Sequence, residues 1–102
     1  MAANDEVVLI AEATALPGKR DDLREAFDIL VPQTRAEEGV NAFILHEARD
    51  KPGHFMLYEV YRDQSAVEAH FGTAHFGAIV KALAEFAEGG VPRLTYYTET
   101  GS

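Results

Sequence analysis

The chain has 102 residues, enough for one domain with a single hydrophobic core and too few for two. Its 17 acidic and nine basic side chains give a formal charge of −8. This charge argues against nucleic acid or an anionic membrane as a partner, because both require a basic face. Cysteine is absent, which excludes disulfides and thiolate chemistry. With an acidic N-terminus unlike a signal peptide and no membrane-length apolar run, we expect a soluble, cytoplasmic protein.

The first half of the chain predicts a strand, a helix and a hairpin. Residues 7–15 are apolar and rich in β-branched side chains, as is typical of a strand. A helix should follow, since acidic side chains would lie in its first turn and apolar residues recur at helical spacing; we expect Gly39 to end it. Residues 41–48 and 55–61 predict two further strands, with Pro52-Gly53 as a turn between them.

The second half predicts a broken helical region and a last strand. Ser65 and Glu68 fit a capping box that opens a short helix, which Gly72 interrupts. Thr73 can cap a second helix, ended by Gly89-Gly90, and residues 91–99 predict a strand with Pro92 at its start or on a sheet edge. The order βαββαβ predicts an α+β, ferredoxin-like fold, with one domain over residues 1–102 and a core over about residues 7–99.

The strand pattern also predicts an oligomer. Alternate residues on both sides of the sheet are apolar, whereas helices in this topology cover only one side. The uncovered side would carry Val8, Ile10, Ile44, Met56, Tyr58 and Val60. Because a soluble monomer rarely exposes such a patch, we expect a homodimer with the two sheets packed face to face.

Several short motifs resemble those of one known family. They are Ile10-Ala11-Glu12, Pro17-Gly18-Lys19, Glu37-Glu38-Gly39 and Tyr58-Glu59-x-Tyr61-x-Asp63-x-x-Ala66-x-x-x-His70-x-x-Thr73-x-His75-Phe76. Together they are similar to the antibiotic biosynthesis monooxygenase domain family over nearly the whole chain. The resemblance implies a dimeric α+β barrel with a small-molecule cavity between sheet and helices. Several such proteins oxidise phenols or quinols with O₂ and without metal or flavin, so no cofactor is expected.

Other branches of this family degrade haem or isomerise a phosphorylated autoinducer-2 signal. Aligned with the haem branch, this chain has Ala13, Tyr61 and Val80 where that branch has its asparagine, tryptophan and histidine ligand. Haem is therefore not expected. The tyrosine, glutamate and histidine pattern is shared by the quinol-oxidising and isomerising branches, and fold alone does not decide between them.

Three titratable side chains are the candidate catalytic groups: Glu59, His70 and His75. Glu59 should face the helices, where burial would raise its pKa and make it a usable proton carrier. The histidines titrate near neutrality, and a bend at Gly72 could bring both toward Glu59. The alternatives are structural: Glu59 accepts hydrogen bonds, His70 packs under the sheet and His75 caps a helix. A metal site is not expected, because the spacing matches no familiar motif.

The same face supplies candidate substrate-binding residues: Tyr61, Phe43, Leu57 and Phe76. His46 should serve the dimer, and His54 should be solvated in a turn. We therefore expect a cofactor-independent monooxygenase acting on a small phenolic or quinol-type compound. The alternatives are an isomerase of a phosphorylated diketone, which would need cations such as Arg49, Arg62, Lys81 or Arg93 at the pocket, and a dimeric small-molecule-binding protein without activity.

Overall fold

Four antiparallel strands form one sheet in the order β2-β3-β1-β4 in the computed structural model, which describes residues 5–101. Along the chain the elements are β1 (Val7–Thr14), α2 (Arg20–Arg35), β2 (Val40–Glu47), β3 (His54–Tyr61), α3 (Gln64–Phe71), α4 (Ala74–Phe86), the short 3₁₀ turn η1 (Glu88–Gly90) and β4 (Arg93–Tyr97). The α+β, ferredoxin-like βαββαβ prediction is confirmed, with the second helical region divided into α3 and α4.

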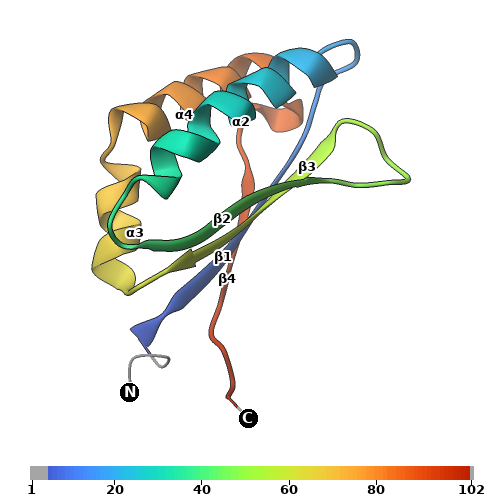
Figure 1. The fold of residues 1–102 in the computed structure, drawn as a ribbon. Coiled ribbons are helices and arrows are strands. Elements are labelled where there is room, and N and C mark those ends of the chain that lie inside the picture. Colours follow the sequence, from blue (N-terminus) through green and yellow to red (C-terminus); the bar gives the residue numbers. More distant parts are fainter. Residues whose placement is uncertain (1–4, 102) are drawn as a thin grey trace.

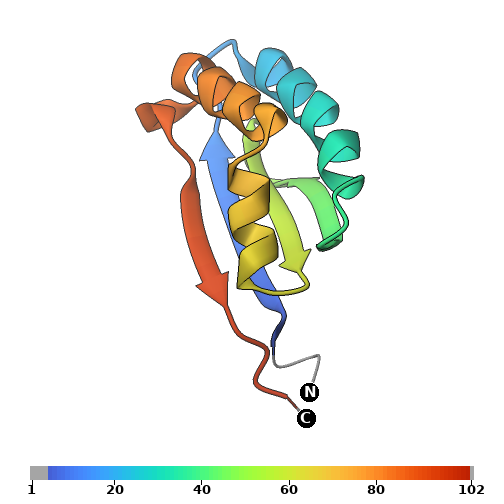
Figure 2. The same ribbon diagram turned by 90° about the vertical axis from the view of Figure 1, so that its left-hand side faces the viewer.

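Helices α2, α3 and α4 lie on one face of the sheet. Figure 1 shows α2 and α4 side by side above the strands, and Figure 2 shows α3 over the same face. Side chains of this face form the core with the helices, among them the nearly inaccessible Leu9, Phe43 and Tyr61. On the opposite face Ile44 and Tyr58 are 41% and 37% exposed. The strands are therefore apolar on both faces and covered on one, as the pattern predicts.

Helix caps explain where the chain turns. The predicted capping box is wrong: α3 begins at Gln64 because Asp63 is its N-cap, and the Asp63 carboxylate accepts hydrogen bonds from the Ala66 amide and from Ser65 Oγ at 2.9 and 2.7 Å. The predicted cap at Thr73 is confirmed, since its Oγ1 accepts a bond from the Phe76 amide. These two caps set the directions of α3 and α4, which carry the histidines.

Gly39 does not end the first helix, contrary to the prediction. Helix α2 stops at Arg35, and Gly39 lies just before β2, where a Cβ atom would collide with the side chain of Ala66. The glycine is needed for this close approach of chain segments. At the other end of the fold, β4 is an edge strand and Pro92 precedes it, as predicted.

Within residues 5–101, no helix combines the length and the apolar character needed to cross a bilayer.

Candidate functional site

A small apolar cavity lies between the sheet and the helices, with a volume of about 40 Å³. Its polar lining residues among those described are Glu12, Glu59 and His70. The apolar lining comprises Leu9, Ala11, Ala13, Phe27, Leu30, Phe43, Leu57, Phe71, Phe76, Ile79, Leu83, Pro92 and Leu94. The predicted Phe43, Leu57 and Phe76 thus lie on the cavity wall. Most of the wall is apolar, so charges inside it are poorly solvated.

Glu59 is a carboxyl group placed by β3 under the helices. It is 4% exposed, and its Oε1 accepts a hydrogen bond from the Tyr61 hydroxyl at 2.5 Å. Burial raises the pKa of Glu59 to about 7, and the nearby charge of Glu37 adds to this rise, while the Tyr61 bond opposes it. A carboxyl group with this pKa can both give and take a proton at neutral pH.

Tyr61 stands behind Glu59 rather than on the cavity wall. It is fully buried, packed with Leu9 and Val67. Burial raises the pKa of its phenol above the ordinary value, and the adjacent carboxyl groups raise it further. The hydroxyl therefore remains protonated at neutral pH and acts as a donor to Glu59. Tyr61 was predicted to bind substrate, but it does not line this cavity. Its hydroxyl contacts Glu59, which does.

His70 lies on the cavity wall within an aromatic shell. Its ring centroid is 5.6 Å from that of Phe43 and 5.3 Å from that of Phe76, and the residue is 2% exposed. Its Nδ1 is 2.8 Å from Glu37 Oε2. Burial lowers the pKa of His70, against the opposing effect of Glu37, so the neutral ring is favoured. With Nδ1 engaged, Nε2 is the nitrogen left for a bound molecule.

His75 approaches the same glutamate from the next helix. Its Nε2 is 2.6 Å from Glu37 Oε2, and it lines a different hollow between α2 and α4. The two imidazoles thus converge on Glu37, and not on Glu59 as expected. We call Glu37, His70 and His75 the Glu37 cluster; their ligand atoms lie within 4.8 Å of one another. His75 does not cap α4, because Thr73 does.

Glu37 stands in the Glu37-Glu38-Gly39 motif, from which no role for its side chain is predicted. Little in the sequence indicates a role for Glu37, because it precedes β2 and lies more than 30 positions from both histidines. The prediction that His54 is solvated is wrong. The residue is half-buried, with Nδ1 2.8 Å from Thr14 Oγ1 and Nε2 3.1 Å from Glu12 Oε1. His46 is exposed, and its Nδ1 is 3.0 Å from the Ile44 carbonyl oxygen.

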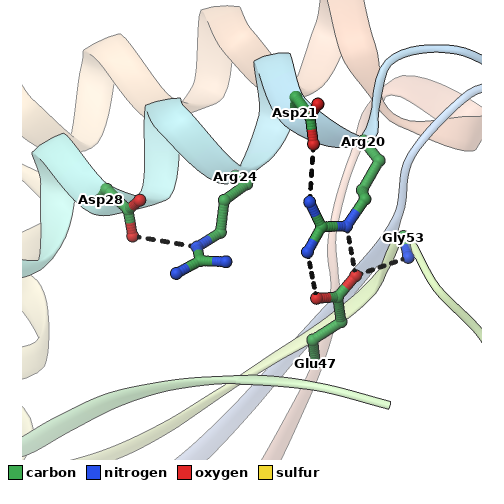
Figure 3. Close-up of polar contacts among 6 residues, drawn as sticks. All are labelled: Arg20, Asp21, Arg24, Asp28, Glu47 and Gly53. Carbon is green, nitrogen blue, oxygen red and sulfur yellow. Dashed lines mark hydrogen bonds and ion pairs between the residues drawn. The ribbon is translucent and has the colours of Figure 1, made fainter. Parts of the chain in front are cut away.

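A second polar centre lies at the other end of the hairpin, outside the cavity (Figure 3). Arg20 binds Glu47 through two nitrogens at 2.7 and 2.8 Å, and Glu47 Oε2 also accepts the Gly53 amide at 2.8 Å. The bonds from Arg20 and Gly53 lower the pKa of Glu47 to about 2. Glu47 therefore stays ionised and ties α2 to the β2–β3 turn.

Comparisons with known proteins agree with this architecture. The family model described as "Antibiotic biosynthesis monooxygenase" matches residues 6–82. The Mycobacterium tuberculosis protein named "Putative monooxygenase Rv0793" is 36% identical over 70 residues, which cover 69% of this chain and 68% of that protein. "Putative monooxygenase YcnE" of Bacillus subtilis is 34% identical over 74 residues, covering 72% of this chain and 78% of that protein.

Solved structures extend the similarity to almost the whole chain. The structure of Rv0793 superposes with a TM-score of 0.88 and covers 95% of this chain and 97% of its own, with 28% identity in that alignment. The crystal structure of PA3566 from Pseudomonas aeruginosa has the same TM-score and identity and covers 95% of this chain and 96% of its own. The range matched by the family model, residues 6–82, spans Glu37, His70 and His75. This chain therefore belongs to the antibiotic biosynthesis monooxygenase family.

Proposed function

We propose that the protein is a cofactor-independent monooxygenase that oxidises a small phenolic or quinol-type compound with O₂. The observation that carries this proposal is a buried, neutral His70 on an apolar cavity wall, beside a Glu59 whose pKa is raised to about 7. These are two proton-transfer groups of different basicity facing one enclosed space.

His70 is the proposed general base. When Nδ1 donates its hydrogen to Glu37, the neutral ring carries an unprotonated Nε2, which can accept the phenolic proton. The Glu37 carboxylate also stabilises the imidazolium that results. His75 holds the same carboxylate oxygen from the other side and is a positioning residue in this scheme. The cavity lining favours His70 over His75 as the base, because His75 borders a different hollow.

The phenolate formed in this way is the electron donor. It reduces O₂, the resulting peroxide is bonded to the ring, and cleavage of the O–O bond leaves one oxygen as a new carbonyl and releases the other as water. For a phenol the balance is phenol plus O₂ giving quinone plus water. Glu59 can supply the proton that water formation requires, and the apolar wall shields the peroxide from solvent.

Substrate entry requires movement of side chains. The cavity of about 40 Å³ is well below the few hundred Å³ of ordinary ligand pockets. The wall includes the half-buried Phe71 and Phe76 and the 41% exposed Leu94, which define its accessible side. We propose that an aromatic ring enters there by displacing these side chains and stacks against Phe76.

The isomerase alternative is less well supported. A phosphorylated diketone needs cationic partners, yet the described cavity lining contains two glutamates and no lysine or arginine. Arg93 borders a separate hollow, and Arg62 pairs with Asp63. The cavity therefore favours an uncharged aromatic compound over a phosphate ester.

Oxygen uptake tests the proposed function. Purified protein with a panel of hydroquinones and naphthoquinols should consume one O₂ for each hydroxylated quinone formed, with water as the other product, above the rate of spontaneous oxidation. Turnover that persists under strict anaerobiosis would support the isomerase instead. Binding of a quinol without accelerated oxidation would identify a binding protein.

We also propose a homodimer formed by the uncovered sheet face, because Ile10, Ile44 and Tyr58 form an apolar row across three strands. Tyr58→Lys should place an ammonium group in that interface and yield monomers or insoluble protein. Ile29→Lys, at a position of α2 that is 57% exposed, is the matched control and should remain dimeric. Analytical ultracentrifugation measures both; a wild-type monomer at micromolar concentration would contradict this proposal.

A further inference from the structure

We propose that the Glu37 cluster binds a divalent transition-metal ion such as Zn²⁺ or Co²⁺, and that the bound ion prevents His70 from acting as a base. The second half rests on the proposed function; the first does not. Glu37 Oε2, His70 Nδ1 and His75 Nε2 supply one carboxylate oxygen and two imidazole nitrogens within 4.8 Å of one another. Two histidines and a carboxylate are a common donor set for such ions.

The present spacing is that of hydrogen bonds and is close to that of a metal site. Glu37 Oε2 lies 2.8 Å from His70 Nδ1 and 2.6 Å from His75 Nε2. Ligands at about 2.0–2.1 Å from a tetrahedral ion are about 3.3 Å apart, so each pair must separate by less than about 1 Å. The ion would replace the two N–H protons that now hold the carboxylate, with solvent completing its coordination.

The surroundings fix the ligands and leave an approach for the ion. His70 and His75 come from α3 and α4, whose junction is held by Thr73: its Oγ1 donates to the His70 carbonyl and accepts from the Phe76 amide. The side chains of Glu37 and His75 are 16% and 18% exposed, so the cluster is reached from solvent without opening the core.

Metal binding would change the tautomer of His70. An ion on Nδ1 requires that nitrogen to be unprotonated, so the neutral ring must carry its hydrogen on Nε2. Nε2 is then a hydrogen-bond donor and cannot accept a phenolic proton. The same three residues would thus orient the base when metal is absent and block it when metal is present. A divalent ion would be a reversible inhibitor of turnover.

Co²⁺ titration tests the metal site without reference to activity. Chelator-treated wild-type protein should develop visible d–d absorption that saturates at one Co²⁺ per chain and is displaced by Zn²⁺. Glu37→Gln and His75→Gln, which keep the size of each side chain nearly unchanged, should weaken binding at least about tenfold. His54→Ala, which removes the other histidine paired with a glutamate, should bind as wild type does. Absence of bands at millimolar Co²⁺, or bands unchanged in both cluster variants, would overturn the site.

Imidazole ¹⁵N NMR tests the blocking effect directly. His70 Nε2 should be unprotonated in the metal-free protein and protonated when Zn²⁺ is bound. An Nε2 that stays unprotonated with Zn²⁺ bound would overturn the inhibitory half of the inference. In quinol assays Zn²⁺ should slow wild-type turnover, each variant being compared with its own metal-free rate. If the protein oxidises no quinol, the proposed function fails while the Co²⁺ and NMR results still decide this inference.

Discussion

Two glutamates on the same face of the same hairpin have opposite chemistry. Glu47 ends β2 and Glu59 lies in β3, and both point toward the helices. Above Glu47, α2 presents Arg20, and the turn presents the Gly53 amide (Figure 3). Above Glu59 there is the Tyr61 hydroxyl, and the apolar wall of the cavity lies alongside. The pKa of Glu47 is lowered to about 2, whereas that of Glu59 is raised to about 7.

The difference shows what converts a structural carboxylate into a proton carrier. A partly solvated glutamate with a bidentate cation stays ionised at every physiological pH and holds two elements together. A buried glutamate with one neutral donor changes protonation near pH 7 and is available for chemistry. Residue type and sheet face are the same; the hydrogen-bond partners and the degree of burial differ.

Of the three variants, His70→Ala should have the largest effect, a loss of quinol turnover at the cavity beside Glu59. Removing the proposed base should lower quinol turnover by about 10² to 10⁴ while the circular dichroism spectrum is retained. His54→Ala is the matched control, since it also removes a histidine paired with a glutamate, and it should keep near-normal turnover. Equal turnover in wild type and His70→Ala would show that the imidazole is structural.

Glu59→Gln should change how stability depends on pH. The folded-state pKa of Glu59 is about 7 and its ordinary value is 4.5, so between these values the folded protein holds a proton that the unfolded chain has released. The Glu59 contribution to stability is therefore fully present below pH 4.5 and falls as pH rises to about 7, by on the order of 3 kcal/mol. Glu59→Gln should remove this fall.

Urea unfolding of both proteins from pH 4.5 to 8, at one protein concentration, measures the effect as the difference between the two curves. Curves that stay parallel over this range would mean that Glu59 titrates alike in the folded and unfolded states. The contributions of other titratable groups, including His70, to the pH dependence of stability are common to both proteins and cancel in the difference.

Glu47→Gln should have the smallest effect and the opposite sign of pH dependence. Its folded-state pKa lies below its ordinary value, so its contribution is present above pH 4.5 and is lost as pH falls toward about 2. Because the Arg20–Glu47 pair is partly exposed, Glu47→Gln should lose little thermal stability at pH 7. Its quinol turnover should equal that of wild type. If Glu47→Gln lost as much turnover as His70→Ala, the view that Glu47 is structural and the cavity with Glu59 is catalytic would be wrong.

Much of the fold follows from the sequence. Period-two and helical patterns predict the strands, the helices and the βαββαβ order, because one-sided burial imposes these periods. The errors are local. Ser65 and Glu68 match the spacing of a capping box, whereas the cap of α3 is Asp63, which accepts a hydrogen bond from the Ala66 amide. Gly39 fits the pattern of a helix end, whereas it is needed because another segment of the chain passes close to it.

The site was less predictable. Burial of Glu59 and the cavity positions of Phe43, Leu57 and Phe76 follow from strand parity and helix spacing. The partners do not: sequence spacing could not show that Glu37 joins α3 and α4, because that contact depends on how the segment before β2 meets both helices. Nor could it separate His70 from His75, which differ in the hollow that each one borders.

The most direct test of this account is the pKa of the Glu59 side chain. Carboxyl ¹³C NMR of glutamate-labelled protein, with Glu59→Gln and Glu47→Gln to assign the two resonances, gives both values in one titration. We expect a midpoint near pH 7 for Glu59 and an ionised Glu47 down to about pH 2. A Glu59 midpoint near the ordinary 4.5 would contradict the claim that this buried carboxyl group carries protons at the cavity.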